Sequence, residues 1–410
     1  MYNLHLSAEQ LEIRDTVRDF VTREIKPVAI NAERLDVCDR RLPMPLLDQA
    51  SQMGLRTLAL SEDHGGAGAD QLTCCIVTEE LAAGDADIAA TLSTTSWLGH
   101  ILFDRLMTDA QRERFMPRFV GDDRCHLAFA GHEAETDTKL GTSYHRPTPI
   151  DAVIKATAAK AANGEWIVNG VKPCVANAPI AALFAVTVKI PGQSNPKVLL
   201  VPADVTGLSV RAHEKPWQHG CSGDVTFKDC HVSAGNLLGD DAAALLDMSG
   251  EGMSWFQALS LGIGRAAYEA ALDYARLRVQ GGRPLIEHQA IGTKLAEIAI
   301  RLEVARGAVW QAAWASDHPD ATADRSLPDL PLQTIAQVFT SEMMVKATKD
   351  AAEIFGAMGV MRDMPLQKYI HDARVCLHSG NGNSEAKLRL AETIAGYRRP
   401  TGQAMAIAGE

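Results

Sequence analysis

The chain is organised around a stretch near its end, Glu353-Ile-Phe-Gly356-Ala-Met-Gly359-Val-Met-Arg, which runs on to Cys376-Leu-His-Ser-Gly-Asn-Gly-Asn-Ser-Glu385. Its first half predicts a helix end followed by a turn that contains both glycines. Because glycine has no Cβ, the backbone N–H groups freed at such a turn can approach a phosphate closely. The stretch therefore predicts an anion-binding turn close to the C-terminal helices.

Helical patterns fill the region before residue 125. The first is predicted from Ser7 to Lys26, with Ser7 and Gln10 as a capping box and with Pro27 ending the run. Four further patterns follow, at Pro43–Met53, Gln71–Ala83, Ile88–Leu106 and Ala110–Val120. A Gly-rich loop, Ser61–Asp70, interrupts them; it follows no strand, so we do not interpret it as a dinucleotide fingerprint.

From about Cys125 the pattern changes to alternating and β-branched runs separated by turn residues, which predicts strands. The runs are Trp166–Val168, Leu183–Lys189, Lys197–Val201, Gly207–Val210 and Val225–Val232. Helical patterns then resume, at Trp255–Ala275, Ile286–Ser316, Thr334–Phe355 and Lys387–Tyr397. The order predicts an α+β chain with a β module between helical regions. We expect domains at 1–124, 125–236 and 237–410.

These features together resemble the acyl-CoA dehydrogenase superfamily over nearly the whole chain. The stretch from Phe355 resembles the family's FGGxGY-type turn, which is followed by a helix with Pro and an RDA-type segment. The loop Ser61–Asp70 resembles the family's PEEYGGxG loop. The resemblance implies an N-terminal helical domain, a middle β-barrel or sandwich domain and a C-terminal four-helix bundle.

The resemblance also implies FAD as cofactor, bound between the middle domain and the bundle. Thr136 and Asp137 match the end of a TEPxxGSD segment. Lys172-Pro-Cys174-Val-Ala176-Asn177 matches KxWITN, with Cys174 in place of the Trp that packs on the flavin and Ala176 in place of a hydrogen-bonding Thr. Each replacement forfeits roughly 0.5–1.5 kcal/mol of binding. We expect weakened rather than abolished FAD binding.

The pyrophosphate side matches the family better. Arg278 and Gln280 stand in a segment that resembles RKQFG, and the resemblance pairs Arg278 with the FAD of a neighbouring subunit, a contact that suits the donor fork of Arg. Gly356 and Gly359 match the turn near the same group, and Ser384 matches the Ser of a Ser-Glu pair.

The chain differs from the family at the position of the catalytic base. The family's C-terminal loop normally carries a Glu, but here the loop reads Ser379-Gly-Asn381-Gly-Asn-Ser384 and contains no carboxylate. Some branches supply the base from the helix near Gly252, which makes Glu251 the candidate base; Asp247 and the loop residue His378 are weaker ones. A solvent-facing Glu at a helix start is the simpler interpretation of Glu251.

The resemblance implies α,β-dehydrogenation of an acyl-CoA or carrier-bound thioester, with electron-transfer flavoprotein as electron acceptor and a homotetramer, or at least a dimer, as the assembly. Two alternatives remain: a flavin monooxygenase or desulfinase-like member of the same fold, and a non-catalytic subunit of a heteromeric dehydrogenase.

Composition limits the other function classes. The net charge of −11, with no dominant basic patch, argues against nucleic acid as a partner. No run approaches the roughly 20 apolar residues of a membrane span, and the eight cysteines contain no CxxC. We therefore expect a cytoplasmic protein with reduced thiols, and the spacing of its His and Cys residues predicts no metal site.

Overall fold

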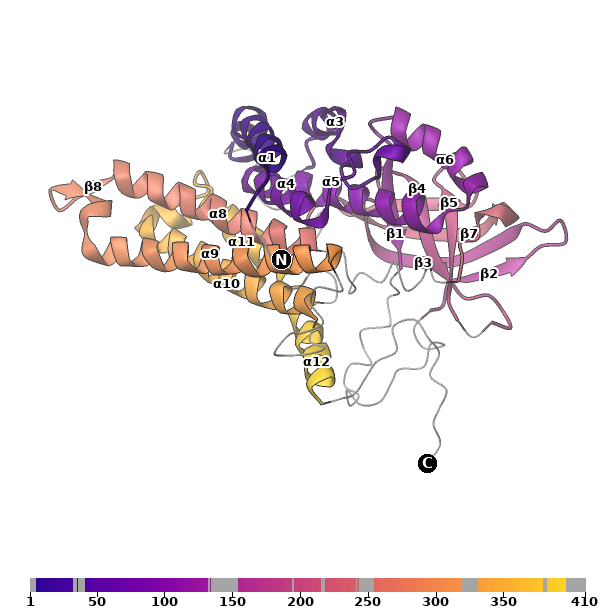
Figure 1. Cartoon of the computed structure of the whole chain (residues 1–410). Helices are drawn as coiled ribbons and strands as arrows, with labels where there is room; N and C mark the ends of the chain where they lie inside the picture. The colour runs from indigo at the N-terminus through magenta and orange to yellow at the C-terminus, as the bar shows by residue number, and fades with distance from the viewer. Residues whose placement is uncertain are drawn as a thin grey trace.

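The structure is a computed structural model that describes residues 5–31, 35, 41–131, 133, 154–193, 195–214, 218–240, 242, 254–318, 331–378 and 382–395. Helices come first, two sheets follow and a helical bundle ends the chain (Figure 1). This order confirms the predicted α+β class. The first helical segments are α1 (Ala8–Phe20), η1 (Val21–Ile25), α2 (Lys26–Ala29), α3 (Met44–Gln52), η3 (Leu55–Thr57), η4 (Glu62–His64), α4 (Gln71–Gly84), α5 (Ala86–Gly99), η5 (His100–Leu106) and α6 (Asp109–Gly121).

The start of α1 confirms the predicted capping box. The Ser7 side chain accepts from the Gln10 N–H, and the Gln10 side chain accepts from the Ser7 N–H. The prediction that Pro27 ends this helix is wrong. After the π-helical turn η1, Pro27 lies in the first turn of α2, where a proline's missing N–H costs no internal hydrogen bond.

The middle of the chain folds into two sheets with orders β1-β4-β5 and β2-β3-β7-β6. Their strands are β1 (His126–Ala130), β2 (Thr157–Lys160), β3 (Trp166–Ala176), β4 (Ala181–Val188), β5 (Lys197–Pro202), β6 (Leu208–Ala212) and β7 (Ser222–Val232). All the predicted strands are present, but β3 runs much further than predicted. Its extension to Ala176 carries the KPCVAN segment to one end of the four-stranded sheet.

The last region is a bundle of α8, α9, α10 and α11, as predicted. Its elements, with the short segments around them, are η8 (Ala234–Asn236), α8 (Ser254–Leu277), β8 (Val279–Gln280), β9 (Arg283–Pro284), η9 (Leu285–Glu287), α9 (Gln289–Asp317), α10 (Leu332–Ile354), η11 (Gly356–Val360), α11 (Leu366–Cys376) and α12 (Gly382–Ile394). The β8–β9 hairpin lies at the end of the bundle away from the sheets (Figure 1).

A network of charges around two buried glutamates, here named the charged seam, joins the N-terminal helices to the bundle. It consists of Arg18, Glu79, Glu80, Arg265 and Arg306. Arg265 donates to both Glu80 oxygens at 3.0 and 2.7 Å, and Arg306 lies 2.8 Å from Glu79. The side chains of Glu79 and Glu80 are only 7% and 5% exposed. Burial alone would raise the pKa of Glu80, but hydrogen bonds and charge from Arg18 and Arg265 outweigh it, so the pKa is lowered.

The helices α4 and α8 approach each other closely beside the charged seam. A Cβ added at Gly262 would lie 2.4 Å from the Glu79 carbonyl oxygen and 2.8 Å from the Ala82 Cβ. Glycine is therefore required there by space. The close approach fixes the bundle against the N-terminal helices and thereby sets the position of α8 relative to the sheets.

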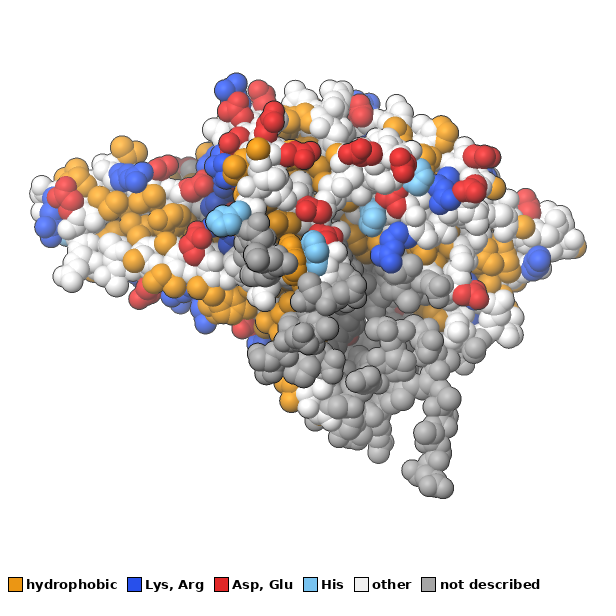
Figure 2. All heavy atoms as spheres, in the orientation of Figure 1, with side chains coloured by type: hydrophobic (Ala, Val, Ile, Leu, Met, Phe, Trp, Pro, Cys, Tyr) orange, Lys and Arg blue, Asp and Glu red, His pale blue; other side chains and the backbone are white. Residues whose placement is uncertain are grey.

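The surface differs between the two ends of the molecule. Acidic side chains are scattered over the N-terminal helices, whereas apolar side chains gather over the bundle (Figure 2). Among the described residues, no helix combines the length and apolar character needed to traverse a bilayer.

Candidate functional site

The end of β3 is the part of the candidate site that the sheets contribute; we name residues 172–177 the sheet edge. Cys174 and Asn177 have left-handed backbones, with φ of 52° and 62°. The pairing of β3 with β7 shifts between Lys172 and Val175, which marks a β-bulge. Bulges re-aim side chains and are frequent beside active sites. Cys174 and Ala176 are both half-buried here.

Asn177 holds the sheet edge against the N-terminal helices. Its Nδ2 lies 3.2 Å from the Thr91 carbonyl oxygen, 3.2 Å from Thr95 Oγ1 and 3.3 Å from the Leu127 carbonyl oxygen. The side chain is buried, so these contacts satisfy an amide that would otherwise be costly. The short polar side chain also tolerates the left-handed backbone. Asn177 thus fixes the edge to α5 and β1.

A buried ion pair lies behind the edge. Lys172 Nζ lies 2.7 Å from Glu133 Oε1, and the two side chains are 0% and 5% exposed. The same Glu133 oxygen accepts from the Ala156 N–H at 2.9 Å. Burial lowers the pKa of Lys172, and the bond to Glu133 offsets part of this effect. The pair anchors Glu133, which lies shortly after β1, to the sheet edge.

A second buried group joins all three regions next to the edge. Gln218 donates to the Cys174 carbonyl at 3.1 Å, and the neighbouring His219 donates from Nε2 to the Asp372 carbonyl of α11 at 3.0 Å. His219 Nδ1 lies 3.6 Å from Asp87 of α5. Burial alone would lower the pKa of His219, but hydrogen bonds with Asp87 and Cys376 outweigh it and raise the pKa to about 10. A charged His219 therefore connects α5, the sheets and α11.

Four of the other predicted cofactor residues, Arg278, Gln280, Gly356 and Gly359, gather at what we name the bundle tip, formed by β8, β9 and η11. Arg278 and Gln280 are exposed there. The rings of Tyr274 and Phe355 stack at 4.1 Å, which holds the end of α8 beside the turn at Gly356. Gly356 has a φ of 58°, and a Cβ there would have nothing within 4 Å. At Gly359 a Cβ would lie 2.4 Å from the Ala352 carbonyl oxygen.

The sheet edge and the bundle tip lie far apart in the folded molecule (Figure 1). The structure therefore brings Arg278 and Gln280 together with Gly356 and Gly359, but it does not bring this set to Cys174 and Ala176. Ser384, on α12, is exposed.

Several predicted residues lie outside the described part of the chain. These are the candidate base Glu251 with Asp247, the flavin-segment residues Thr136 and Asp137, and Asn381 of the C-terminal loop. His378 is described and is exposed just after α11.

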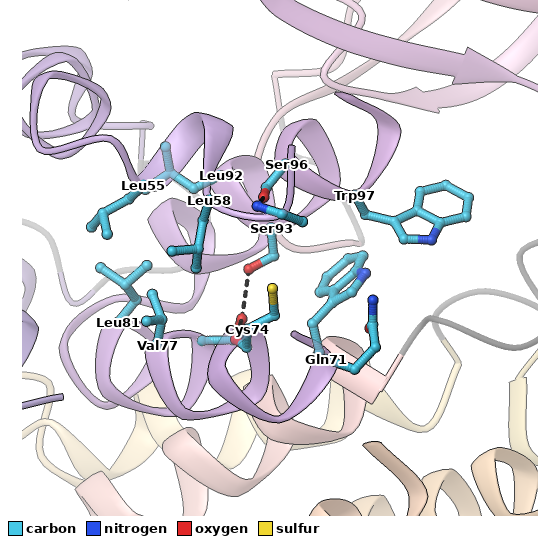
Figure 3. A pocket seen from close by; sticks show the side chains of 13 residues that line it. Leu55, Leu58, Gln71, Cys74, Val77, Leu81, Leu92, Ser93, Ser96 and Trp97 are labelled. Carbon is cyan, nitrogen blue, oxygen red and sulfur yellow. Dashed lines mark hydrogen bonds between the residues drawn. The ribbon is translucent and has the colours of Figure 1, made fainter. Parts of the chain in front are cut away.

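A small cavity between α4 and α5 is a poor candidate for a substrate pocket. Leu81, Leu92 and Trp97 are among its lining residues, and Thr78 and Ser93 share a 2.8 Å hydrogen bond across it (Figure 3). Only about 20 Å³ is open to the centre of a water molecule. That is room for about one water. An acyl chain does not fit without movement of these helices.

Sequence reasoning missed the polar groups that surround the sheet edge, namely Glu133, His213, His219 and Asp224. Glu133 lies 39 positions from Lys172, and His213, His219 and Asp224 lie 39, 45 and 50 positions from Cys174. The pairing of β7 with β3 and β6 brings His213 and Asp224 to Cys174. No spacing signal exists for such groups.

Comparisons with known proteins agree over the full length. Family models match in the same order as the structural regions: the N-terminal domain of acyl-CoA dehydrogenase at residues 7–123, its middle domain at 150–230 and its C-terminal domain at 256–394. The chain is 30% identical to an acyl-CoA dehydrogenase of Bacillus subtilis (strain 168) over 407 residues, covering 96% of this chain and 100% of the relative.

Solved structures share the fold. The butyryl-CoA dehydrogenase of Megasphaera elsdenii superposes with a TM-score of 0.82 at 23% identity, covering 96% of this chain and 100% of that one. The FAD complex of PigA superposes with a TM-score of 0.79 at 20% identity, covering 97% and 100%. The predicted resemblance is confirmed by this agreement in sequence, domain order and fold, and the chain belongs to the acyl-CoA dehydrogenase family.

Proposed function

We propose that this chain is an FAD-dependent oxidoreductase that removes hydrogen from the α and β carbons of an acyl thioester, either an acyl-CoA or a carrier-bound one. The observation that carries the proposal is the full-length match to acyl-CoA dehydrogenases, at 30% identity over 96% of the chain. Family members are flavin-dependent oxidoreductases. The electron acceptor we propose is electron-transfer flavoprotein.

The residues of the bundle tip fit the pyrophosphate of FAD. Arg278 offers an exposed guanidinium, and the left-handed turn at Gly356 leaves open space beside its backbone. Arg forks and freed N–H groups are the usual donors to such an anion. Gln280 and Gly359 complete the proposed set at the bundle tip. Ser384 is a separate proposed contact on α12, whose Asn383 is joined to Ser341 of α10. On the sheet side Cys174, Ala176 and Thr136 would face the flavin. FAD supplies a two-electron acceptor when it is bound.

The distance between the sheet edge and the bundle tip supports an oligomer in which one copy's tip completes another copy's site. Large apolar side chains are exposed at the tip and along α9: Leu277 is 82% exposed, Val360 71% and Ile300 62%. Exposed apolar patches of this kind mark protein interfaces. We propose a homotetramer, or at least a dimer. Light scattering measures the mass, and Arg278→Ala should weaken FAD binding without dissociating the assembly.

Glu251 is the base that we propose. A base must take the α-proton while hydrogen-bond donors stabilise the developing enolate. In sequence, Glu251 stands one residue from the position that supplies the base in related branches, and the C-terminal loop lacks a carboxylate. His378 is the second candidate, since it is exposed in that loop region and imidazole can act as a base near neutral pH.

Anaerobic bleaching of the flavin by a panel of acyl thioesters tests this assignment. Glu251→Gln should abolish bleaching, whereas Glu113→Gln, an exposed residue on α6, should leave it unchanged. Full bleaching by Glu251→Gln together with its loss in His378→Gln would transfer the role to His378. Reoxidation by electron-transfer flavoprotein rather than by oxygen would support dehydrogenation.

A second function is favoured by one observation, the replacement of aromatic and hydroxyl groups at Cys174 and Ala176. An altered flavin environment fits a flavin monooxygenase or desulfinase-like activity, and complete loss of FAD would fit a non-catalytic subunit of a heteromeric dehydrogenase. Substrate-dependent oxygen uptake by the reduced enzyme distinguishes the monooxygenase. A homo-oligomer that holds stoichiometric FAD contradicts the non-catalytic subunit.

We further propose that the protein works in the cytoplasm. No disulfide joins any two cysteines among the described residues, and Cys74, Cys75 and Cys376 are buried thiols. Reduced thiols are typical of that compartment. Fractionation of cells that express the protein from its own gene tests the assignment.

A further inference from the structure

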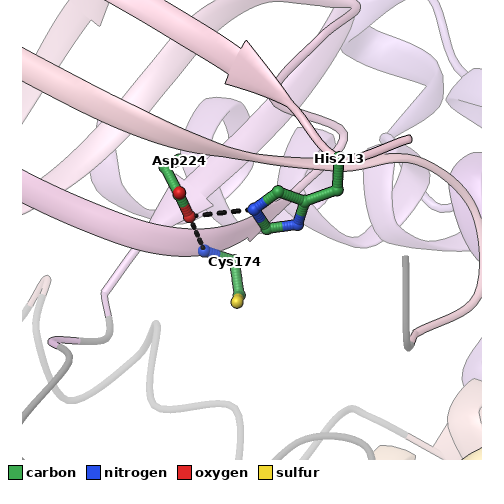
Figure 4. A group of neighbouring side chains, drawn as sticks. All are labelled: Cys174, His213 and Asp224. Atoms are coloured by element: carbon green, nitrogen blue, oxygen red, sulfur yellow. Dashed lines mark hydrogen bonds and ion pairs between the residues drawn. The ribbon is translucent and has the colours of Figure 1, made fainter. Parts of the chain in front are cut away.

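Three side chains with different donor atoms meet at the sheet edge (Figure 4). Cys174 comes from β3, Asp224 from β7, and His213 directly follows β6. The sulfur of Cys174, a ring nitrogen of His213 and a carboxylate oxygen of Asp224 all lie within 4.8 Å of one another. Within the described residues, this is the group of His, Cys, Asp or Glu whose atoms are close enough to share a metal ion.

Strand register explains why these residues meet. β7 is paired with β3 on one side and with β6 on the other. Gly223, the neighbour of Asp224, pairs with both Val175 and Ala212. Asp224 on β7 therefore lies between its two neighbouring strands, β3 and β6, and Cys174 and His213 reach it from either side. The three positions are 39 and 11 residues apart in sequence, so no spacing motif could reveal them.

The backbone at Cys174 is held in an unfavourable conformation. Its φ of 52° lies in the left-handed region, which costs a residue other than glycine roughly 1 kcal/mol or more. The β-bulge at this point turns the residue out of the regular ladder. The Cys174 N–H donates to Asp224 Oδ1 at 3.1 Å, so the carboxylate also fixes the backbone of its neighbour. A strained backbone of this kind persists when the surrounding contacts hold it in place, and such residues cluster at functional sites.

Outer partners orient the other two donors. His213 Nε2 lies 3.0 Å from Asp224 Oδ1, and His213 Nδ1 lies 3.1 Å from Ser222 Oγ. Arg211 pairs with the second carboxylate oxygen. Arg211, the Cys174 N–H and His213 thus hold the carboxylate in place, and Ser222 helps to fix the imidazole ring, as the outer partners of metal ligands do.

We propose that Cys174, His213 and Asp224 bind a divalent transition-metal ion, with zinc as the best fit. Sulfur, imidazole and carboxylate are together the donors that zinc accepts, and three protein ligands leave a fourth position for water or a substrate group. Metal–ligand bonds of about 2.0–2.3 Å place the donor atoms of a tetrahedral site roughly 3.3–3.8 Å apart. The three donor atoms lie within 4.8 Å of one another, so side-chain rotations that move them by about 1 Å complete the site.

Binding requires a defined rearrangement of protons. The Cys174 thiol releases its proton to solvent and binds as thiolate. His213 binds through Nε2, and its ring proton moves to Nδ1, where it donates to Ser222 Oγ. The hydrogen bond between His213 and Asp224 is replaced by their two bonds to the metal. His213 and Asp224 are 20% and 18% exposed, so an ion can reach them from solvent.

The simpler interpretation is a hydrogen-bonded network that only stabilises the bulge. That role needs Asp224 and the Cys174 N–H, but it does not need a sulfur atom. Replacement of Cys174 by Ser therefore separates the two interpretations, because the backbone bond to Asp224 remains in both proteins.

Cobalt titration of the reduced, chelator-treated full chain tests the proposal. Binding of one Co²⁺ per chain should give a thiolate-to-metal charge-transfer band. It should also give intense d–d bands, which lie at wavelengths longer than those at which flavin absorbs. Zn²⁺ should displace the bound Co²⁺ and remove both. Cys174→Ser should remove the charge-transfer band, and His213→Ala and Asp224→Asn should each weaken binding by more than the about 10–100-fold that loss of an outer partner costs. Ser222→Ala should fall within that 10–100-fold range.

Two matched variants serve as controls. Cys221→Ser changes a half-buried cysteine outside the cluster, and His231→Ala changes an exposed histidine on the same strand as Asp224. Both should bind Co²⁺ as the parent does. No Co²⁺ binding by the parent, or unchanged bands in Cys174→Ser, overturns the proposal. Circular dichroism checks that each variant is folded. The outcome does not depend on FAD, so it stands apart from a failure of the proposed oxidoreductase function.

Discussion

The charged seam and the sheet edge both contain buried ion pairs, but they differ in how they are supported. In the seam two glutamates meet three arginines drawn from α1, α8 and α9. At the edge one lysine meets one glutamate, and the residues beside them differ from the family pattern at Cys174 and Ala176. The seam holds the helices together, whereas the edge carries two of the residues that we propose to face the cofactor. We therefore expect the seam to govern stability and the edge to govern cofactor binding.

Breaking the seam should have the largest effect. Arg265→Met removes a cation from between Glu79 and Glu80 and leaves the two buried carboxylates close together. Breaking a buried pair costs about 3–5 kcal/mol of the free energy of unfolding. Denaturant unfolding at one fixed protein concentration measures this loss. Arg276→Met is the matched control on the same helix, because its side chain is 61% exposed, and it should change stability by less than about 1 kcal/mol.

Acid should destabilise the surroundings of the sheet edge at a higher pH than it destabilises the seam. His126 lies beside Thr95, which contacts Asn177 of the edge. Burial, with a contribution from Arg56, lowers the pKa of His126 to about 4. The unfolded chain therefore binds more protons between pH 6.5 and 4, and stability falls as pH decreases through that window, by about 3 kcal/mol at most. Because the pKa of Glu80 is lowered, the seam loses its ion pairs, and the stability that they contribute, only at a lower pH.

The pH effect is checked by unfolding curves between pH 7 and pH 4. His126→Gln should flatten the dependence in that window, and His231→Gln, at an exposed site, should not. His219 contributes little there, because its pKa is raised and both folded and unfolded chains carry the proton below pH 6.5. A slope that is the same in His126→Gln and in the parent would contradict this account.

Addition of one methyl group should change stability in opposite directions at two glycines of the bundle. Gly262→Ala forces a Cβ against the Glu79 carbonyl beside the seam, at a cost of about 1–3 kcal/mol. Gly307→Ala meets nothing within 4 Å inside α9 and should stabilise by about 0.5–1 kcal/mol through helix propensity. Thermal unfolding of both variants measures the opposite signs. Equal effects would show that α4 and α8 are less closely packed than described.

The smallest effect is expected from restoring a hydroxyl at the sheet edge. Ala176→Thr returns the hydrogen-bonding group of the family pattern. One such bond is worth about 0.5–1.5 kcal/mol, which is about 2- to 12-fold in affinity. Titration of FAD by fluorescence should show this gain, while Ala159→Thr, exposed on β2, should show none. Unchanged affinity in Ala176→Thr would remove Ala176 from the cofactor site.

The sequence predicted most of the fold because its signals were local. The capping box at Ser7 and the strand runs are confirmed, since hydrophobic periodicity and turn residues act over a few positions. Pro27 was misjudged because a π-helical turn precedes it and shifts the proline into a new first turn. The resemblance to the family supplied Arg278 and Gly356, which the structure places at one tip.

The polar groups around the sheet edge could not be predicted in this way. His213 and Asp224 acquire meaning only when β6, β7 and the bulge of β3 are in register. In the sequence, nothing distinguishes Lys172 from other lysines in strands, because its buried partner Glu133 is distant along the chain. Interactions between distant strands leave no periodic trace, so the sequence identified the positions of Cys174 and Ala176 but not their surroundings.

The visible absorption spectrum of the purified full chain, recorded before and after addition of FAD and gel filtration, shows whether the chain holds the flavin. A retained oxidised-flavin band at about one flavin per chain is expected, because the family fold and the bundle tip are intact and the losses at Cys174 and Ala176 are each roughly 0.5–1.5 kcal/mol. A colourless protein that holds no FAD after this treatment would contradict the proposed oxidoreductase function and would favour a non-catalytic subunit.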